Sequence, residues 1–192
     1  MGSLGAVDFT FSVTPQGTLT VGGESERLCT DDVSYSAYCG NHGYKLCIVT
    51  SHKCYRFGEK KLILLIVVGL ASIPDITLWD YALQILKLDV IPLVVWLGDN
   101  AFQGCIDTVT PYQSWHHCVM NQLQIQNTLH FNHKHSGRRI DVENMIGEIK
   151  EWAFVRGRTD IRLFDTKEKF EECINCIWSL VNYRNIGCPQ TI

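Results

Sequence analysis

The chain has 192 residues, which is the size of one ordinary domain. It carries 17 Lys and Arg against 20 Asp and Glu, and 46% of its residues are hydrophobic while only 19% are charged. This composition excludes an intrinsically disordered chain, and the formal net charge of −3 argues against a domain that grips nucleic acid through overall positive charge. Any contact with nucleic acid must therefore be local.

The first third of the chain is typical of strands separated by a loop-rich segment. Alternating apolar and polar residues over 7–13 predict a strand with a period of two. Residues 15–40 are polar and rich in Gly and Ser, so they predict a loop-rich insertion with a short strand over 18–21. Two further strands are predicted over 44–50 and over the apolar run 61–71, the second buried on both faces.

The middle of the chain alternates helical and extended patterns. Pro74 starts a predicted helix, because its missing N–H costs nothing at that position. The apolar stripe of this helix contains Ile76, Trp79, Leu83 and Leu86. A buried strand is predicted over 90–97, and a weaker strand over 105–109. Residues 113–137 are predicted to be loop or short helix.

Two helices are predicted to close the chain. The first, over 139–154, has its apolar positions at Val142, Ile146, Ile149 and Ala153. The second has a broad apolar face made of Phe170, Cys173, Ile174, Ile177, Leu180 and Val181. The order of strands and helices predicts a mixed α/β architecture in which helices cover one sheet.

Three carboxylates occupy unusual places in this pattern. Asp8 lies inside the first predicted strand, Asp99 ends an apolar strand, and Glu143 follows a core position of a helix. Ligand sites in α/β sheets favour the carboxyl ends of strands, and hard divalent cations such as Mg²⁺ need oxygen ligands. Each acid taken alone is more often simply exposed to solvent. Spacing by itself leaves the choice between a metal site and solvated acids open.

Six short motifs follow one another along the chain, at residues 5–10, 38–45, 72–75, 97–100, 110–112 and 131–150. The last of them contains an Asn, a His-Ser pair and an Arg, followed by Val-Glu, Gly and Lys. In these motifs and in their order, the sequence resembles the DDE superfamily endonucleases of the PIF/Harbinger transposase type, which have a ribonuclease H-like catalytic domain. The segment 131–150 is the clearest match.

The resemblance implies a catalytic function and a set of partners. It implies a single ribonuclease H-like domain over 1–192 that cleaves DNA and transfers strands, with Asp8, Asp99 and Glu143 as catalytic residues and ligands of two Mg²⁺ or Mn²⁺ ions. The substrate would be double-stranded DNA, both transposon ends and target, in the nucleus. The resemblance is also compatible with a homo-oligomer and with a separate partner protein that binds DNA. The candidates for contacting DNA are Lys134, Arg138, Arg139 and Lys150.

A second hypothesis is an inactive transposase-derived domain that acts, if at all, by binding DNA or protein. It is suggested by departures from the family pattern, because Phe9 replaces the usual Gly and residues 100–102 replace Ser-Gly-Tyr. Only seven residues precede Asp8, so we expect a catalytic domain without the helical DNA-binding region that such transposases carry.

Two other site chemistries have weaker support. A zinc module is suggested by His and Cys clusters, but structural zinc sites usually need two paired knuckles and only one CxxC is present. A cysteine nucleophile lacks the electropositive turn that would activate its thiol. The residues considered for zinc are His116, His117, Cys118, His130, His133, His135, Cys173 and Cys176.

The nine cysteines also bear on where the protein resides. The first six residues are too short and uncharged for a signal peptide, so we expect a reducing, intracellular compartment with mostly free thiols. The most apolar run, residues 62–71, is about half the length of roughly 20 residues that a membrane helix needs. We therefore expect no membrane segment.

Overall fold

A computed structural model describes most of the chain. The described residues are 3–13, 19–21, 24–26, 35–36, 41–51, 61–86, 95–105, 107–152, 155 and 167–186. Their strands are β1 (Ser3–Val13), β2 (Leu19–Val21), β3 (Glu24–Glu26), β4 (Tyr35–Ser36), β5 (Asn41–Ser51), β6 (Ile63–Leu70), β7 (Val95–Leu97) and β8 (Thr108–Val109). Their helices are α1 (Asp75–Leu86), α2 (Gln122–Lys150) and α4 (Lys167–Ile186), with two 3-10 helices, η3 (Asn100–Phe102) and η4 (Ser114–Val119).

Six of the described strands form one mixed sheet that positions the site, while β2 and β3 pair with each other in a separate two-stranded sheet. Strand β5 pairs antiparallel with β1 on one side and with β6 on the other, and β4 continues the pairing at the start of β5. On the other edge of β1, β7 runs parallel to β1 and β8 runs parallel to β7. This order confirms the expected mixed α/β single domain, and it is consistent with a ribonuclease H-like fold.

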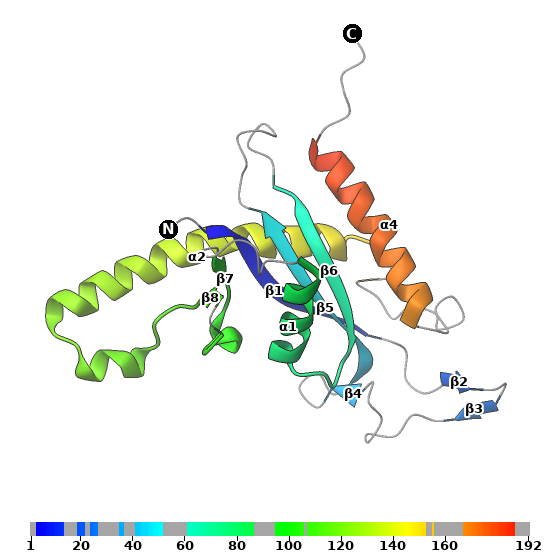
Figure 1. The fold of residues 1–192 in the computed structure, drawn as a ribbon, viewed down its shortest axis with the longest axis horizontal. Coiled ribbons are helices and arrows are strands. Elements are labelled where there is room, and N and C mark those ends of the chain that lie inside the picture. Colours follow the sequence, from blue (N-terminus) through cyan, green and yellow to red (C-terminus); the bar gives the residue numbers. More distant parts are fainter. Residues whose placement is uncertain are drawn as a thin grey trace, which may run out of the picture.

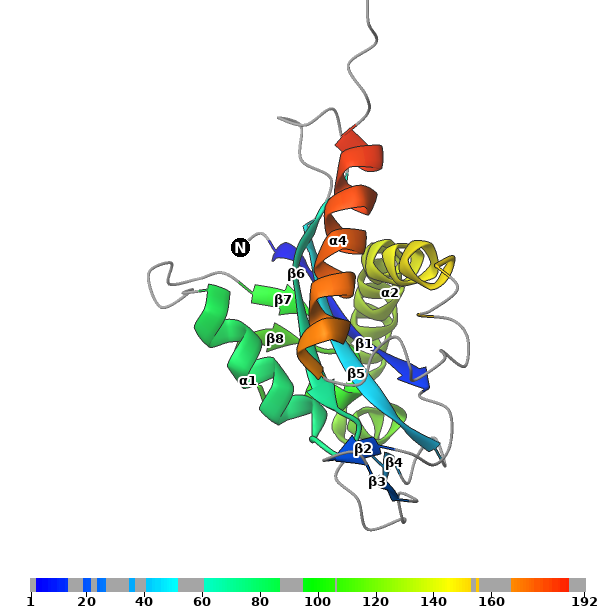
Figure 2. The same cartoon turned by 90° about the vertical axis from the view of Figure 1, so that its right-hand side faces the viewer.

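Helices cover both faces of the sheet. Figure 2 shows α1 on one side of the strands and α2 with α4 on the other. Successive side chains of a strand point to opposite faces, so Ala6 packs in the core under α2 and α4 while Val7 packs in the core under α1. By the same alternation Asp8 points to the α2 face. The sheet thus presents this carboxylate to the helix that carries Glu143.

Helix α2 is far longer than the sequence predicted. It begins at Gln122, where Asn121 and Gln124 form a reciprocal capping box, so the prediction of loop or short helix over 113–137 was wrong for most of that segment. Its first half is rich in Gln, Asn and His and has no clear apolar stripe, which is why periodicity did not reveal it. Figure 1 shows this half extending beyond the sheet.

The other elements differ from prediction in detail. In α1 the buried residues are Leu78, Trp79 and Ala82, whereas Ile76 is exposed, so the buried face is turned from the predicted stripe. The predicted strand over 105–109 is reduced to β8, because Cys105 donates its N–H to the Phe102 carbonyl in a turn. In α4 the predicted face is buried except for Leu180, which is exposed, and Cys173, which is half-buried.

Some segments and cysteines named in the sequence analysis lie outside the described residues. The described cysteines have free thiols, while Cys29, Cys39, Cys54 and Cys188 lie outside the described part. Residues 90–94, 153 and 154 of the predicted elements also lie outside it. None of the helices described is long and apolar enough to span a bilayer.

Candidate active site

Asp8 is a half-buried carboxylate in the middle of β1. Its side chain is 16% exposed, and its Oδ1 accepts the Phe9 N–H at 2.8 Å. Burial raises the pKa of the Asp8 carboxyl above its ordinary value, and the negative charge of Asp99 adds to this. The guanidinium of Arg139 and the Phe9 N–H oppose the rise. Asp8 therefore stands where a further positive charge would be favourable.

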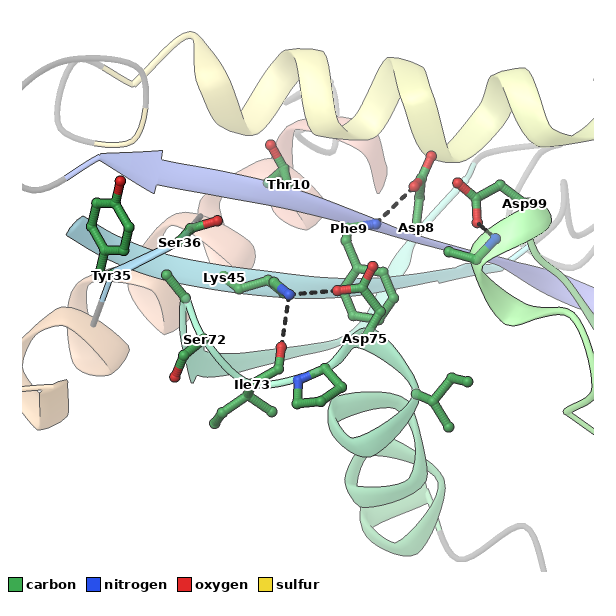
Figure 3. Close-up of a pocket in the computed structure, with 14 residues that line it drawn as sticks. Asp8, Phe9, Thr10, Tyr35, Ser36, Lys45, Ser72, Ile73, Asp75 and Asp99 are labelled. Atoms are coloured by element: carbon green, nitrogen blue, oxygen red, sulfur yellow. Dashed lines mark hydrogen bonds and ion pairs between the residues drawn. The ribbon is translucent and has the colours of Figure 1, made fainter. Parts of the chain in front are cut away.

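Asp99 comes to Asp8 because β7 is the parallel neighbour of β1. It directly follows the carboxyl end of β7 and caps η3, its Oδ1 accepting the Ala101 N–H at 2.9 Å. Gly98 allows this turn, because a Cβ there would lie 2.5 Å from Thr108 Cγ2 and 2.8 Å from the Phe102 ring. In Figure 3 the carboxylates of Asp8 and Asp99 point toward each other. Two predicted site residues are thus brought together.

Glu143 is connected to Asp8 through the side chain of Arg139. One nitrogen of Arg139, Nη2, lies 2.5 Å from Asp8 Oδ2 and 3.4 Å from Glu143 Oε1. The Glu143 side chain is 54% exposed, so its carboxylate is largely in contact with solvent. The sequence contained a signal for one of these contacts, since residues four apart on a helix are neighbours. It contained no signal that Arg139 would also contact Asp8.

Two side chains of helix α2, Asn132 and His135, hold it against β8 and the residues that follow this strand. Asn132 accepts the Tyr112 N–H at 2.8 Å and donates to the Tyr112 carbonyl at 2.7 Å. His135 Nε2 lies 2.9 Å from the Val109 carbonyl, which can only accept, so this nitrogen carries the proton. These tethers place Arg139, one turn further along the helix, over β1.

A pocket of about 900 Å³ opens beside Asp8 and Asp99. Across it, Lys45 Nζ donates to Asp75 Oδ1 at 2.6 Å and to the Ile73 carbonyl at 2.7 Å (Figure 3). This ion pair joins β5 to the first residue of α1. Sequence reasoning missed it as a part of the site, because the two residues are thirty positions apart and share no local pattern.

The predicted DNA-contacting cations lie along α2. Lys134 and Arg138 are exposed, and Lys150 is half-buried at the end of the helix. Arg139 is only 15% exposed, and its guanidinium faces carboxylates. Three further arginines follow in the sequence after this helix and lie outside the described residues; they are Arg156, Arg158 and Arg162.

The cysteine chemistry considered from sequence finds little support among the described thiols. Burial raises the pKa of Cys47, with the charges of Asp75 and Asp8 adding to the effect. Burial also raises the pKa of Cys105 and Cys173. A raised pKa leaves the thiol protonated and unreactive near neutrality.

The donor set fits a hard divalent cation in its chemistry. Asp8 and Asp99 are facing carboxylates, and hard cations take oxygen ligands. Within the described ranges, however, no group of three or more His, Cys, Asp or Glu side chains is close enough to hold a metal ion. That holds for the predicted triad, whose third member contacts Arg139, and for the His and Cys clusters considered for zinc.

Comparison with known protein families shows to which family the chain belongs. Residues 17–182 match the family described as DDE superfamily endonuclease. The chain belongs to this family. The matched range includes Asp99 and Glu143 and begins after Asp8, which is brought to Asp99 by the pairing of β1 with β7. No curated protein and no solved structure matches the chain.

Proposed function

We propose that this DDE superfamily endonuclease is the catalytic domain of a PIF/Harbinger-type transposase, spanning residues 1–192 with a loop-rich insertion at about 15–40. It hydrolyses phosphodiesters of double-stranded DNA and transfers the strand ends. The single observation that carries the proposal is the meeting of Asp8 and Asp99, from neighbouring parallel strands, at a pocket beside the helix that bears Glu143.

The three carboxylates are the residues that would hold two Mg²⁺ or Mn²⁺ ions. When bound, such ions supply positive charge that stabilises the attacking and leaving oxygens of a phosphoryl transfer. Asp8 and Asp99 hold their carboxylates at the sheet, while Glu143, more exposed, approaches from the helix. This division leaves the open side of the pocket for the DNA backbone.

The exposed cations of α2 supply the contact with DNA. Lys134 and Arg138 are four residues apart and exposed, so they can follow a phosphate backbone along one side of the helix. Lys150 adds a charge at the far end. The net charge of the whole chain stays negative, so binding depends on this local strip and weakens with added salt.

The proposal also includes the cellular compartment of the protein and its binding partners. Free thiols and a DNA substrate fit a nuclear protein, and cleavage at two transposon ends fits a homo-oligomer or a complex with a separate DNA-binding protein. The alternative of an inactive, merely binding domain makes the opposite prediction for catalysis. A nicking assay therefore separates the two.

The test is nicking of a supercoiled plasmid that carries the element's terminal repeats, with Mg²⁺ or Mn²⁺. Wild type should nick it, and Glu143→Gln should lose more than roughly 100-fold in rate, because even outer-shell partners of a metal cost about 10–100-fold. Glu148→Gln is the matched control, since Glu148 lies on the same helix but binds Arg184. Its rate should stay near that of wild type.

Equal rates for wild type and Glu143→Gln would contradict the proposal. The same is true if nicking is unchanged when the divalent ion is removed with a chelator.

A further inference from the structure

Arg139 occupies the space between the first and third carboxylates of the proposed site. A single nitrogen, Nη2, contacts Asp8 Oδ2 at 2.5 Å and Glu143 Oε1 at 3.4 Å. The two carboxylates come from different elements, β1 and α2. The guanidinium therefore joins the sheet to the helix through the residues that the proposed function assigns to metal ions.

Both oxygens of Asp8 are already engaged. Oδ1 accepts the Phe9 N–H at 2.8 Å, and Oδ2 accepts from Arg139. A divalent ion bound to Oδ2 would place a second positive charge next to the guanidinium, so the ion and the arginine would repel each other and compete for Asp8.

The hydrogen-bonding capacity of the Arg139 side chain is not fully used. Its Nε is buried and has no hydrogen-bond partner, while its side chain is 15% exposed. A buried donor without a partner costs free energy, so Nε does not help to hold the guanidinium in place. The contacts that hold it are those of Nη2 with the two carboxylates. An ion that takes over the carboxylates removes what holds it there.

We propose that Arg139 is an internal positive charge that a divalent metal ion can replace at the carboxylates of Asp8 and Glu143. It keeps Asp8 and Glu143 together in the metal-free protein, and it gives them up to a divalent ion, so it lowers the affinity for the metal. This inference rests on the proposed function, because it assumes that these carboxylates bind metal. Arg139 is a positioning residue here, since it acts through the carboxylates.

The test measures Mn²⁺ binding by calorimetry on the full chain, without DNA. Arg139→Met should bind Mn²⁺ on the order of tenfold more tightly than wild type, because a positive charge next to the ligands is gone. Arg139→Lys keeps the charge and should stay near wild type. Arg184→Met removes one positive charge elsewhere, next to Glu148, and should leave the affinity unchanged.

Thermal unfolding supplies a second readout and checks that each variant folds. Without metal, Arg139→Met should melt at a lower temperature than wild type, because Asp8 loses its nearest compensating charge. Saturating Mn²⁺ should then raise its melting temperature by more than it raises that of wild type, since a tighter ligand stabilises the native state more.

The outcomes separate this inference from the proposed function. If folded Arg139→Met binds Mn²⁺ with the affinity of wild type or more weakly, the exchange is overturned while the nuclease site stands. If neither wild type nor the variant binds Mn²⁺, both proposals fail. If Arg139→Met does not fold, the wild-type protein decides: the side-chain ¹⁵N resonances of Arg139 should shift on addition of Mg²⁺, and unchanged resonances at saturation overturn the exchange.

Discussion

The ring of Phe9 stacks on the ring of Phe102, with centroids 5.1 Å apart and planes inclined by 11°. Phe9 follows Asp8 on β1, and Phe102 closes the turn that Asp99 begins. The stack therefore connects the two segments that carry the facing carboxylates. The resemblance noted in the sequence implies Gly and Tyr at these two positions, and the two phenylalanines that stand there instead are in contact with each other.

Loss of this stack should weaken both segments together. We expect Phe9→Ala to lower the free energy of unfolding by about 2 kcal/mol, roughly half the loss for a fully buried phenylalanine. A double-mutant cycle with Phe102→Ala should give a coupling of about 0.5–1.5 kcal/mol, as for other aromatic pairs. Urea denaturation measures both values.

Phe170 provides the control for this cycle. It lies in the other core, stacked on Tyr44, so Phe9→Ala and Phe170→Ala should add within about 0.5 kcal/mol. A Phe9–Phe102 coupling no larger than that of this control pair would show that the stack contributes nothing of its own.

Gly98 should be intolerant of any side chain. We expect Gly98→Ala to destabilise the protein by about 1–3 kcal/mol, because its Cβ would meet Thr108 Cγ2 and the Phe102 ring. Nicking should fall by at least about tenfold as well, since the clash displaces the neighbouring Asp99 and small misplacements of a reacting group are costly. Chemical denaturation and the plasmid assay measure the two effects.

A glycine of the same chain serves as the control. Gly147 lies on α2 with nothing within 4 Å of a built Cβ, so Gly147→Ala should stabilise by about 0.5–1 kcal/mol. Unchanged stability of Gly98→Ala would mean that the turn after β7 adjusts freely.

Asn182 anchors α4 to the start of β6. Its side chain accepts the Ile63 N–H at 2.8 Å and donates to the Ile63 carbonyl at 2.8 Å. We expect Asn182→Ala to lower the free energy of unfolding by about 1–3 kcal/mol, because a backbone donor is left without its partner. Thermal or urea unfolding checks this, and Asn175→Ala, exposed on the same helix, should change stability by less than about 0.5 kcal/mol. Equal effects of the two substitutions would contradict the anchoring role.

His135 should make the stability depend on pH. Burial lowers the pKa of this imidazole below its ordinary value of 6.5, the hydrogen bond to the Val109 carbonyl opposes the shift, and Arg139 adds to it. The unfolded chain then binds the proton more readily than the native state. The contribution of His135 to stability is therefore complete above pH 6.5 and is lost as the pH falls through 6.5 toward the lower native pKa.

His135→Gln tests this dependence because an amide keeps a donor for the Val109 carbonyl and does not titrate. We expect the drop in urea midpoint between about pH 7.5 and pH 5 to be smaller in this variant than in wild type. His130→Gln, exposed on the same helix, should retain the wild-type drop. Identical pH profiles for His135→Gln and wild type would argue against the assignment.

Much of the fold could be predicted from sequence, because strands and amphipathic helices leave local periodic patterns. The patterns around β1, β5, β6 and α4 were sufficient for this. The first half of α2 was missed for a physical reason: it extends beyond the sheet, so it needs no continuous apolar face, and its capping box is its main local signal. In α1 the buried face was turned, because contacts with the sheet select which apolar residues are covered.

The sequence by itself determined which acids stand out, namely Asp8, Asp99 and Glu143, and the family to which the chain belongs. Only the tertiary structure decided how they meet. Strand pairing brings Asp8 to Asp99, and helix packing puts Arg139 between Asp8 and Glu143. Such contacts join residues far apart in the chain and depend on sheet order and register, which local patterns do not encode.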